Sequence, residues 1–215
     1  MATGAMGREQ VHYEAVPANK VKAEMDAFLH WFNHEERIDP VLKAAIAHFW
    51  FIIIHPFDDG NGRIGRAISD MLLARAEGSG ERFYSMSSQM LAERKQYYEV
   101  LQNTQHSTGD ISEWLHWFLQ CLQNAIRATE QSTQKILRKV EFWRKHEQTD
   151  INERQRLMLN KLLDGFDGKL QSSKWAKIAK VSADTALRDI KDLIAKNILR
   201  QSAEGGRKAS YELVQ

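Results

Sequence analysis

Residues 55–66 carry the side chains of this sequence that are best suited to chemistry on phosphates. They read HPFDDGNGRIGR and hold a histidine, two aspartates, a Gly-Asn-Gly turn and two arginines. Histidine titrates near neutral pH, so His55 can take a proton from an incoming nucleophile. Gly60 and Gly62 permit a tight turn whose backbone N–H groups converge on an anion. The stretch is therefore predicted to bind a phosphate group.

A buried helix is expected to lead into this stretch. Asp39 followed by proline is typical of a helix start, and residues 40–54 are apolar on most sides. Pro56 disfavours the helical conformation for the residue before it, so the helix should end at His55. His48 lies within this helix, where we expect a hydrogen-bonded core histidine and not a ligand.

A second helix is expected to follow the turn, from near Arg63 to about Ala76. Its positive end and its unpaired N–H groups would point at the bound anion. Arg63 and Arg66 are three residues apart and would share one face of this helix. Two guanidinium groups beside such a turn suit a polyphosphate better than a single carboxylate.

The two aspartates before the turn imply a metal ion. A carboxylate beside phosphates is unfavourable unless a cation lies between them, so Asp58 or Asp59 should hold Mg²⁺. His55 is left as the group that takes up the proton. The residues alone therefore predict nucleotidyl or phosphoryl transfer.

Residues 55–66 also resemble the signature of the Fic-domain family, His-x-Phe-x-Asp/Glu-Gly-Asn-Gly-Arg-x-x-Arg, at every specified position. The resemblance implies a protein adenylyltransferase, which moves AMP from ATP to a Ser, Thr or Tyr hydroxyl of a target or of itself and releases pyrophosphate. It implies that His55 is catalytic and that Asp59 carries Mg²⁺. The ATP-binding residues that it implies are Val16, Gly60, Asn61, Gly62, Arg63, Ile64, Gly65, Arg66 and Tyr98.

Within this set, the resemblance assigns separate tasks. Residues 60–62 would form the anion hole, Arg63 would hold the β-phosphate and Arg66 the γ-phosphate. Phe57 would point inward and anchor the loop.

The adenine pocket is less well marked. The resemblance places an aromatic or apolar wall of the pocket on a helix expected from about Ser88 to Gln102. Tyr98 is the candidate, but Tyr97 lies beside it, and packing or surface exposure remains an alternative for either.

The N-terminal residues are expected to carry a β-flap. Residues 11–17 alternate bulky and polar side chains before a proline, as an exposed strand would. They resemble the second half of the flap on which Fic proteins dock the target protein; an ordinary edge strand or tail is the alternative. Residues 1–7 look like an expression scar.

Charge divides the chain. Residues 1–150 carry 17 Lys+Arg against 20 Asp+Glu, whereas residues 151–215 carry 13 against 8. Three short helices and a hairpin expected in the second part resemble a winged helix-turn-helix domain. Its third helix and its turn carry a basic set: Arg188, Lys191, Arg207 and Lys208. The same helix carries three aspartates that would repel DNA, so a DNA partner and a protein partner both stay open: Asp184, Asp189 and Asp192.

We therefore expect a mainly α protein with a Fic-type helical catalytic domain at 8–150, whose short β-flap lies at about 11–17. A winged helix-turn-helix domain follows at 151–215. Cys121 is the single cysteine and no apolar run could cross a membrane, so a cytoplasmic protein without a membrane partner is expected. A homo-oligomer stays open.

Two other functions stay open: a nucleotide-sensing regulatory winged-helix protein, and a Fic-type enzyme that removes AMP from modified targets. Many Fic proteins also carry an inhibitory Ser/Thr-x-x-x-Glu-Gly/Asn helix. Neither Glu77-Gly78 nor Glu204-Gly205 matches it, because Leu73 and Arg200 stand four residues before those glutamates. A deregulated enzyme is therefore expected.

Overall fold

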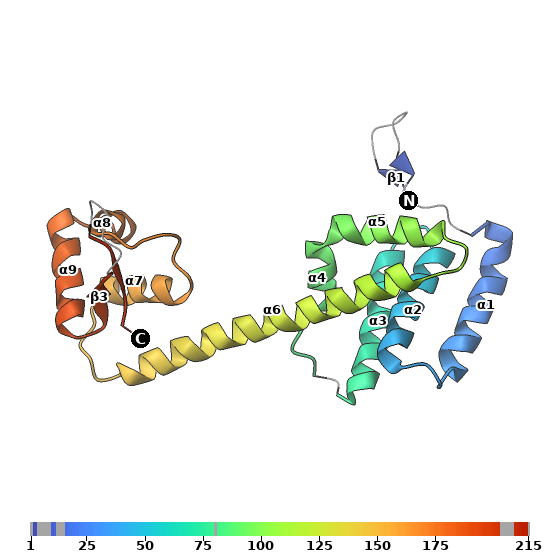
Figure 1. The fold of residues 1–215 in the computed structure, drawn as a ribbon, viewed down its shortest axis with the longest axis horizontal. Helices are drawn as coiled ribbons and strands as arrows, with labels where there is room; N and C mark the ends of the chain where they lie inside the picture. The colour runs from blue at the N-terminus through green and yellow to red at the C-terminus, as the bar shows by residue number, and fades with distance from the viewer. Residues whose placement is uncertain (1, 4–9, 12–15, 80, 203–208, 215) are drawn as a thin grey trace. The chain divides into compact units, whose positions relative to one another are not determined.

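The protein divides into two compact units, Met1–Glu130 (unit 1) and Gln131–Gln215 (unit 2), which Figure 1 shows as ribbons. The computed structural model describes residues 2–3, 10–11, 16–79, 81–202 and 209–214. Helices dominate both units, which confirms the predicted mainly α fold class. None of the helices in these ranges is long and apolar enough to cross a membrane.

A short antiparallel strand pair comes first. β1 (Ala2–Thr3) pairs with β2 (Gln10–Val11), and Ala2 is opposite Val11. β1 therefore lies within the segment predicted to be an expression scar. Of the predicted flap at 11–17, residues 12–15 lie outside the described residues.

The central helix of unit 1 is α2. The helices of this unit are α1 (Ala18–His34), α2 (Pro40–Ile54), α3 (Asn61–Glu77), α4 (Met86–Ala92), α5 (Arg94–Gln105) and the first part of α6 (Ser112–Lys145). As predicted, Asp39 caps α2: its carboxylate accepts the N–H groups of Val41 at 2.9 Å and Leu42 at 3.2 Å. Most of α2 is buried because α1 and α3 both pack against it.

The predicted helix from Ser88 to Gln102 is two helices. Glu93 separates α4 from α5, and its carboxylate accepts the side-chain amides of Gln89 at 2.6 Å and Asn124 at 2.9 Å. Asn124 belongs to α6, so the residue at this break contacts a distant part of the chain.

α6 belongs to both units. Trp114 and Phe118 near its start are fully buried in the core of unit 1, whereas Phe142 and Trp143 near its end pack against the core of unit 2. The division after Glu130 thus falls inside one continuous helix. The predicted boundary at 150 lies just after this helix.

Unit 2 is built from three helices and a two-stranded sheet. They are α7 (Glu153–Leu163), α8 (Ser172–Ala179), α9 (Ala183–Ala195), β3 (Leu199–Gln201) and β4 (Tyr211–Leu213). The strands are antiparallel, with Arg200 opposite Glu212, and a single bridge joins Leu170 to Tyr211. This is the order of elements predicted for 151–215; the winged-helix assignment stays a prediction. Arg207 and Lys208 of the turn lie outside the described residues.

Candidate active site

His55 ends α2, where the proline after it was predicted to break the helix. Its backbone is left-handed, with φ 50° and ψ 55°, and its N–H donates to the carbonyl of Phe51 at 3.1 Å. Partial burial of the imidazole lowers the pKa of His55 below 6.5, and hydrogen bonding with the Ile52 backbone opposes this shift. The neutral form therefore dominates at pH 7, as a general base requires.

The loop after His55 is held by Asn61. Its side-chain oxygen accepts the N–H of Phe57 at 3.1 Å, and its amide donates to the carbonyl of the same residue. Asn61 is buried, so both polar atoms of its side chain serve the loop. Its contribution to a bound anion would come from its backbone N–H.

The resemblance implied that Phe57 points inward, but the structure leaves it only half-buried. Half of its side chain is exposed, although its ring centroid lies 6.4 Å from that of Phe51. The clamp of Asn61 on the Phe57 backbone explains the difference, because it fixes the loop without burying the ring.

α3 begins at Asn61, earlier than the predicted start near Arg63. Gly60 precedes it with φ 87°, a left-handed conformation that favours glycine. The N–H of Ile64 makes the first helical hydrogen bond, to the carbonyl of Gly60 at 3.0 Å. The N–H groups of residues 61–63 therefore lack acceptors within the helix and form an anion-binding end with its dipole.

Asp59 and Arg63 lie at this end of α3 and pair with each other. Asp59 Oδ2 is 3.1 Å from Arg63 Nη2, and Oδ1 accepts the N–H of Gly60 at 2.6 Å. The side chains of Asp59 and Arg63 are 92% and 73% exposed. Exposed pairs of this kind contribute little to stability, so both groups can exchange partners when a ligand binds.

The surroundings of Asp59 fit a Mg²⁺ ion that takes most of its ligands from phosphate and water. Its carboxylate faces solvent beside the anion-binding end of α3. Within the described part of the chain, no group of three His, Cys, Asp or Glu side chains could hold a metal ion by itself.

Arg66 and Tyr98 meet in a pocket of about 470 Å³. Its other walls come from α4 and α5: Ser87, Ser88, Met90, Leu91, Arg94 and Tyr97. The guanidinium carbon of Arg94 lies 5.6 Å from the centre of the Tyr98 ring. Among the described residues, Arg66 and Arg94 have no ion-pair partner, so the pocket presents two positive charges and an aromatic wall.

Arg94 is the pocket residue that sequence reasoning missed. It precedes Tyr98 by one helical turn, so the two share a face of α5. The four-residue spacing from the candidate tyrosine could have identified it.

The remaining predicted ATP-binding residues are less clearly placed. Gly65 is buried against α2: a Cβ atom added there would lie 2.9 Å from Cδ1 of Ile52, so the glycine permits close packing of two helices. Ile64 is 37% exposed beside it. Val16 is half-buried just before α1. ATP binding by these three residues stays a prediction.

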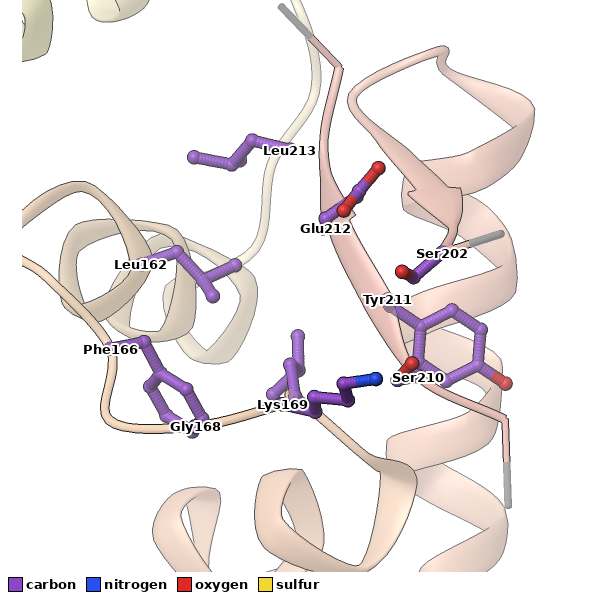
Figure 2. A pocket seen from close by; sticks show the side chains of 10 residues that line it. Leu162, Phe166, Gly168, Lys169, Ser202, Ser210, Tyr211, Glu212 and Leu213 are labelled. Carbon is purple, nitrogen blue, oxygen red and sulfur yellow. The ribbon is translucent and has the colours of Figure 1, made fainter. Parts of the chain in front are cut away.

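Unit 2 has a pocket of its own, of about 550 Å³, which Figure 2 shows. Leu162 and Phe166 line one side, and Tyr211 and Leu213 of β4 line the other. None of the predicted catalytic or ATP-binding residues lies in it.

Comparisons with known proteins relate part of this chain to one family. Residues 3–73 match the model of the Fic/DOC family. The protein adenylyltransferase Fic of Nematostella vectensis is 32% identical over 124 residues, which cover 57% of this chain and 27% of the relative. The protein of the same name from Drosophila grimshawi is 35% identical over 104 residues, which cover 47% and 20%. The chain thus spans only a fifth to about a quarter of the length of these curated relatives.

A crystal structure of a Fic family protein from Desulfovibrio desulfuricans G20 aligns with 93% of this chain and 57% of that one. Its sequence identity is 20% and its TM-score is 0.48, which is too low to establish a shared fold.

Proposed function

We propose that this chain is a protein adenylyltransferase of the Fic/DOC family, because residues 3–73 match the model of that family and relatives named protein adenylyltransferase Fic are similar to it. It transfers AMP from ATP to a Ser, Thr or Tyr hydroxyl of a target protein or of itself. The observation that carries the proposal is the arrangement at the end of α2, where a neutral, half-buried histidine is followed by a clamped turn and an open helix N-terminus.

In the proposed reaction the target oxygen bonds to the α-phosphorus of ATP while His55 takes its proton. The bond from the α-phosphorus to the bridging oxygen breaks, and pyrophosphate leaves. The N–H groups that open α3 hold the charged phosphate oxygens. Arg63 and Arg66 hold the pyrophosphate portion, and Tyr98 forms a wall for the base. Mg²⁺, held by Asp59, would neutralise charge on the phosphates.

The experiment that tests the proposal follows the two ends of ATP separately. The chain is incubated with Mg²⁺ and ATP labelled at either the α- or the γ-phosphate, alone and in a lysate. Label from the α position should become bound to protein, including this chain, and label from the γ position should not. Retention of the γ label would indicate phosphoryl transfer and contradict the proposal.

The same preparation tests removal of AMP. A protein that already carries AMP is added without ATP, and free AMP is measured. Release of AMP at a rate above that of transfer would favour the alternative function, an enzyme that removes AMP from modified targets.

A specific observation also supports duplex DNA as a partner of unit 2. Of the three α9 aspartates that we expected to repel DNA, one is buried and a second is exposed but paired. Asp189 is 5% exposed and receives two hydrogen bonds of 3.1 Å from Arg154. Asp192 accepts from Gln155 at 2.7 Å and from Lys196 at 2.6 Å.

The exposed side chains of α9 then include Arg188 and Lys191, together with Asp184 and the paired Asp192. The expected repulsion is weaker than the sequence suggested, which favours DNA over a protein partner. Binding of a duplex by unit 2 should weaken steeply between low and moderate salt. Binding that is absent or insensitive to salt would favour a protein partner.

A further inference from the structure

A chain of buried polar side chains joins three helices of unit 1. His48 of α2 and Ser69 of α3 are fully buried, and Tyr97 of α5 is nearly so. His48 Nδ1 is 3.3 Å from Ser69 Oγ, and His48 Nε2 is 3.1 Å from the Tyr97 hydroxyl. The expected hydrogen-bonded core histidine is thus confirmed.

The direction of each hydrogen bond follows from the number of protons. Ser69 has one hydroxyl proton, and Oγ donates it to the carbonyl of Arg66 at 2.9 Å. Toward His48 the same oxygen can only accept, so Nδ1 carries a proton and donates it.

The other ring nitrogen is then settled as well. Burial lowers the pKa of His48 to about 3, so the ring carries a single proton at neutral pH and Nε2 is an acceptor. Burial also raises the pKa of Tyr97, which keeps the hydroxyl proton that Nε2 accepts. The bonds therefore run one way: Tyr97 to His48, His48 to Ser69, and Ser69 to the main chain of Arg66.

Both ends of this chain of bonds belong to the pocket. Arg66 and Tyr97 line it, while His48 lies behind them in the core. The ring of His48 stacks on Trp114 at 5.5 Å, and Trp114 in turn donates to the carbonyl of Ala45 at 2.8 Å. Trp114 thus holds the ring of His48 from a second side, so the position of the ring behind the pocket is fixed.

We propose that His48 is a positioning residue of the nucleotide site, which fixes the backbone of Arg66 through Ser69 and the side chain of Tyr97 directly. The inference rests on the proposed function, because it assigns the pocket to ATP. His48 is fully buried and does not line the pocket, so it does not touch the nucleotide itself. It acts through Arg66, which holds the terminal phosphate.

A double-mutant cycle tests this coupling in the full chain. Ser69→Ala should raise the Kd for ATP about tenfold, equivalent to about 1.4 kcal/mol, because Arg66 loses its fixed backbone. In the Arg66→Ala background the same substitution should change the Kd less than twofold. Tyr97→Phe, which keeps the ring, provides a second entry to the cycle if Ser69→Ala folds poorly. Equal effects in both backgrounds would overturn the inference.

Two conservative replacements of His48 separate positioning from plain stability. The amide of His48→Asn can replace Nδ1 and donate to Ser69, whereas the amide of His48→Gln can replace Nε2 and accept from Tyr97. Both should lower the melting temperature, but the Asn variant should bind ATP several-fold more tightly than the Gln variant. Equal loss of affinity in the two would count against a role through Arg66.

The control is Leu73→Ala, which removes a buried side chain of α3 outside the network. It should lower the melting temperature and leave the Kd for ATP unchanged at a temperature where the variant is folded. A native chain that binds no ATP would overturn the proposed function and this inference together. A native chain that binds ATP but shows an additive cycle would overturn this inference alone.

Discussion

Asp59 pairs with Arg63 in unit 1, and Asp189 pairs with Arg154 in unit 2, but the two pairs meet very different amounts of solvent. The Asp59 side chain is 92% exposed, whereas that of Asp189 is 6% exposed. Asp59 accepts one hydrogen bond from its arginine, whereas Asp189 accepts two. The first pair spans one turn around the start of α3, and the second joins α7 to α9.

This difference separates an ion pair that can bind a ligand from an ion pair that holds two helices together. A solvent-exposed pair contributes little stability, so a ligand or a metal ion can replace either partner at small cost. A buried carboxylate without its cation is strongly unfavourable, so the second pair must stay closed for unit 2 to keep its packing. An aspartate and an arginine can therefore exchange partners with a ligand in unit 1, whereas the same two residue types stay bound to each other in unit 2.

The largest expected effect comes from His55, in the loop that also carries the exposed Asp59. His55→Ala should lower the rate of AMP transfer by about 10²–10⁴, because the general base is lost, while ATP binding stays close to that of the native chain. Initial rates with α-labelled ATP and the Kd for ATP measure the two properties. If more than a tenth of the rate remained, the base would have to be another group.

The next effect concerns stability and tests the buried pair of Arg154 and Asp189. Arg154→Ala should lower the melting temperature of unit 2 by roughly 5–10 °C, because it leaves the carboxylate of Asp189 buried without a cation. Adding Asp189→Asn should restore part of the loss, since a neutral amide is easier to bury. Differential scanning calorimetry measures these shifts.

The matched control for that variant is Arg63→Ala, which breaks the exposed pair. Its melting temperature should stay within about 1 °C of the native value. Similar shifts for Arg63→Ala and Arg154→Ala would remove the distinction between the two pairs.

Local patterns were sufficient to predict much of unit 1. Asp39 before a proline marked the start of α2, and a proline after His55 marked its end. These signals work because capping and the restriction before proline depend on residues within one turn. The turn after His55 and the helix α3 that follows it were predictable for the same reason, since they are contiguous in the sequence.

Features that depend on distant partners were missed. At the break, Glu93 accepts a hydrogen bond from the amide of Asn124, which comes from another helix. The inward direction of Asp189 requires Arg154, which lies on α7, so the charge count along α9 overstated its repulsion. The loop at Phe57 is clamped by the side chain of Asn61 through the Phe57 backbone, whereas the Phe57 ring was expected to anchor it.

A smaller effect is expected when the exposed carboxylate is removed. Asp59→Ala should weaken Mg²⁺-dependent ATP binding by about tenfold and leave the melting temperature unchanged, because the carboxylate acts through the metal ion. ATP titrations at several Mg²⁺ concentrations measure the effect. Asp58→Ala is the matched control, and a larger effect in Asp58→Ala would transfer the metal ligand to that residue.

The smallest expected effect is a pH dependence that separates two histidines, one in each unit. Partial burial lowers the pKa of His55 below 6.5, so falling pH protonates this base later than an ordinary histidine. With a pKa of 6.5, about a quarter of the base would remain neutral at pH 6, so the native chain should keep clearly more than a quarter of its pH 8 rate. The rate should then fall at lower pH, because a protonated imidazole cannot accept the target's proton.

Burial also lowers the pKa of His146 in unit 2, with the charge of Lys145 adding to the shift. His146→Gln is therefore the control: its pH profile should match that of the native chain, and a profile that moved with His146 instead would place the titrating group outside the loop.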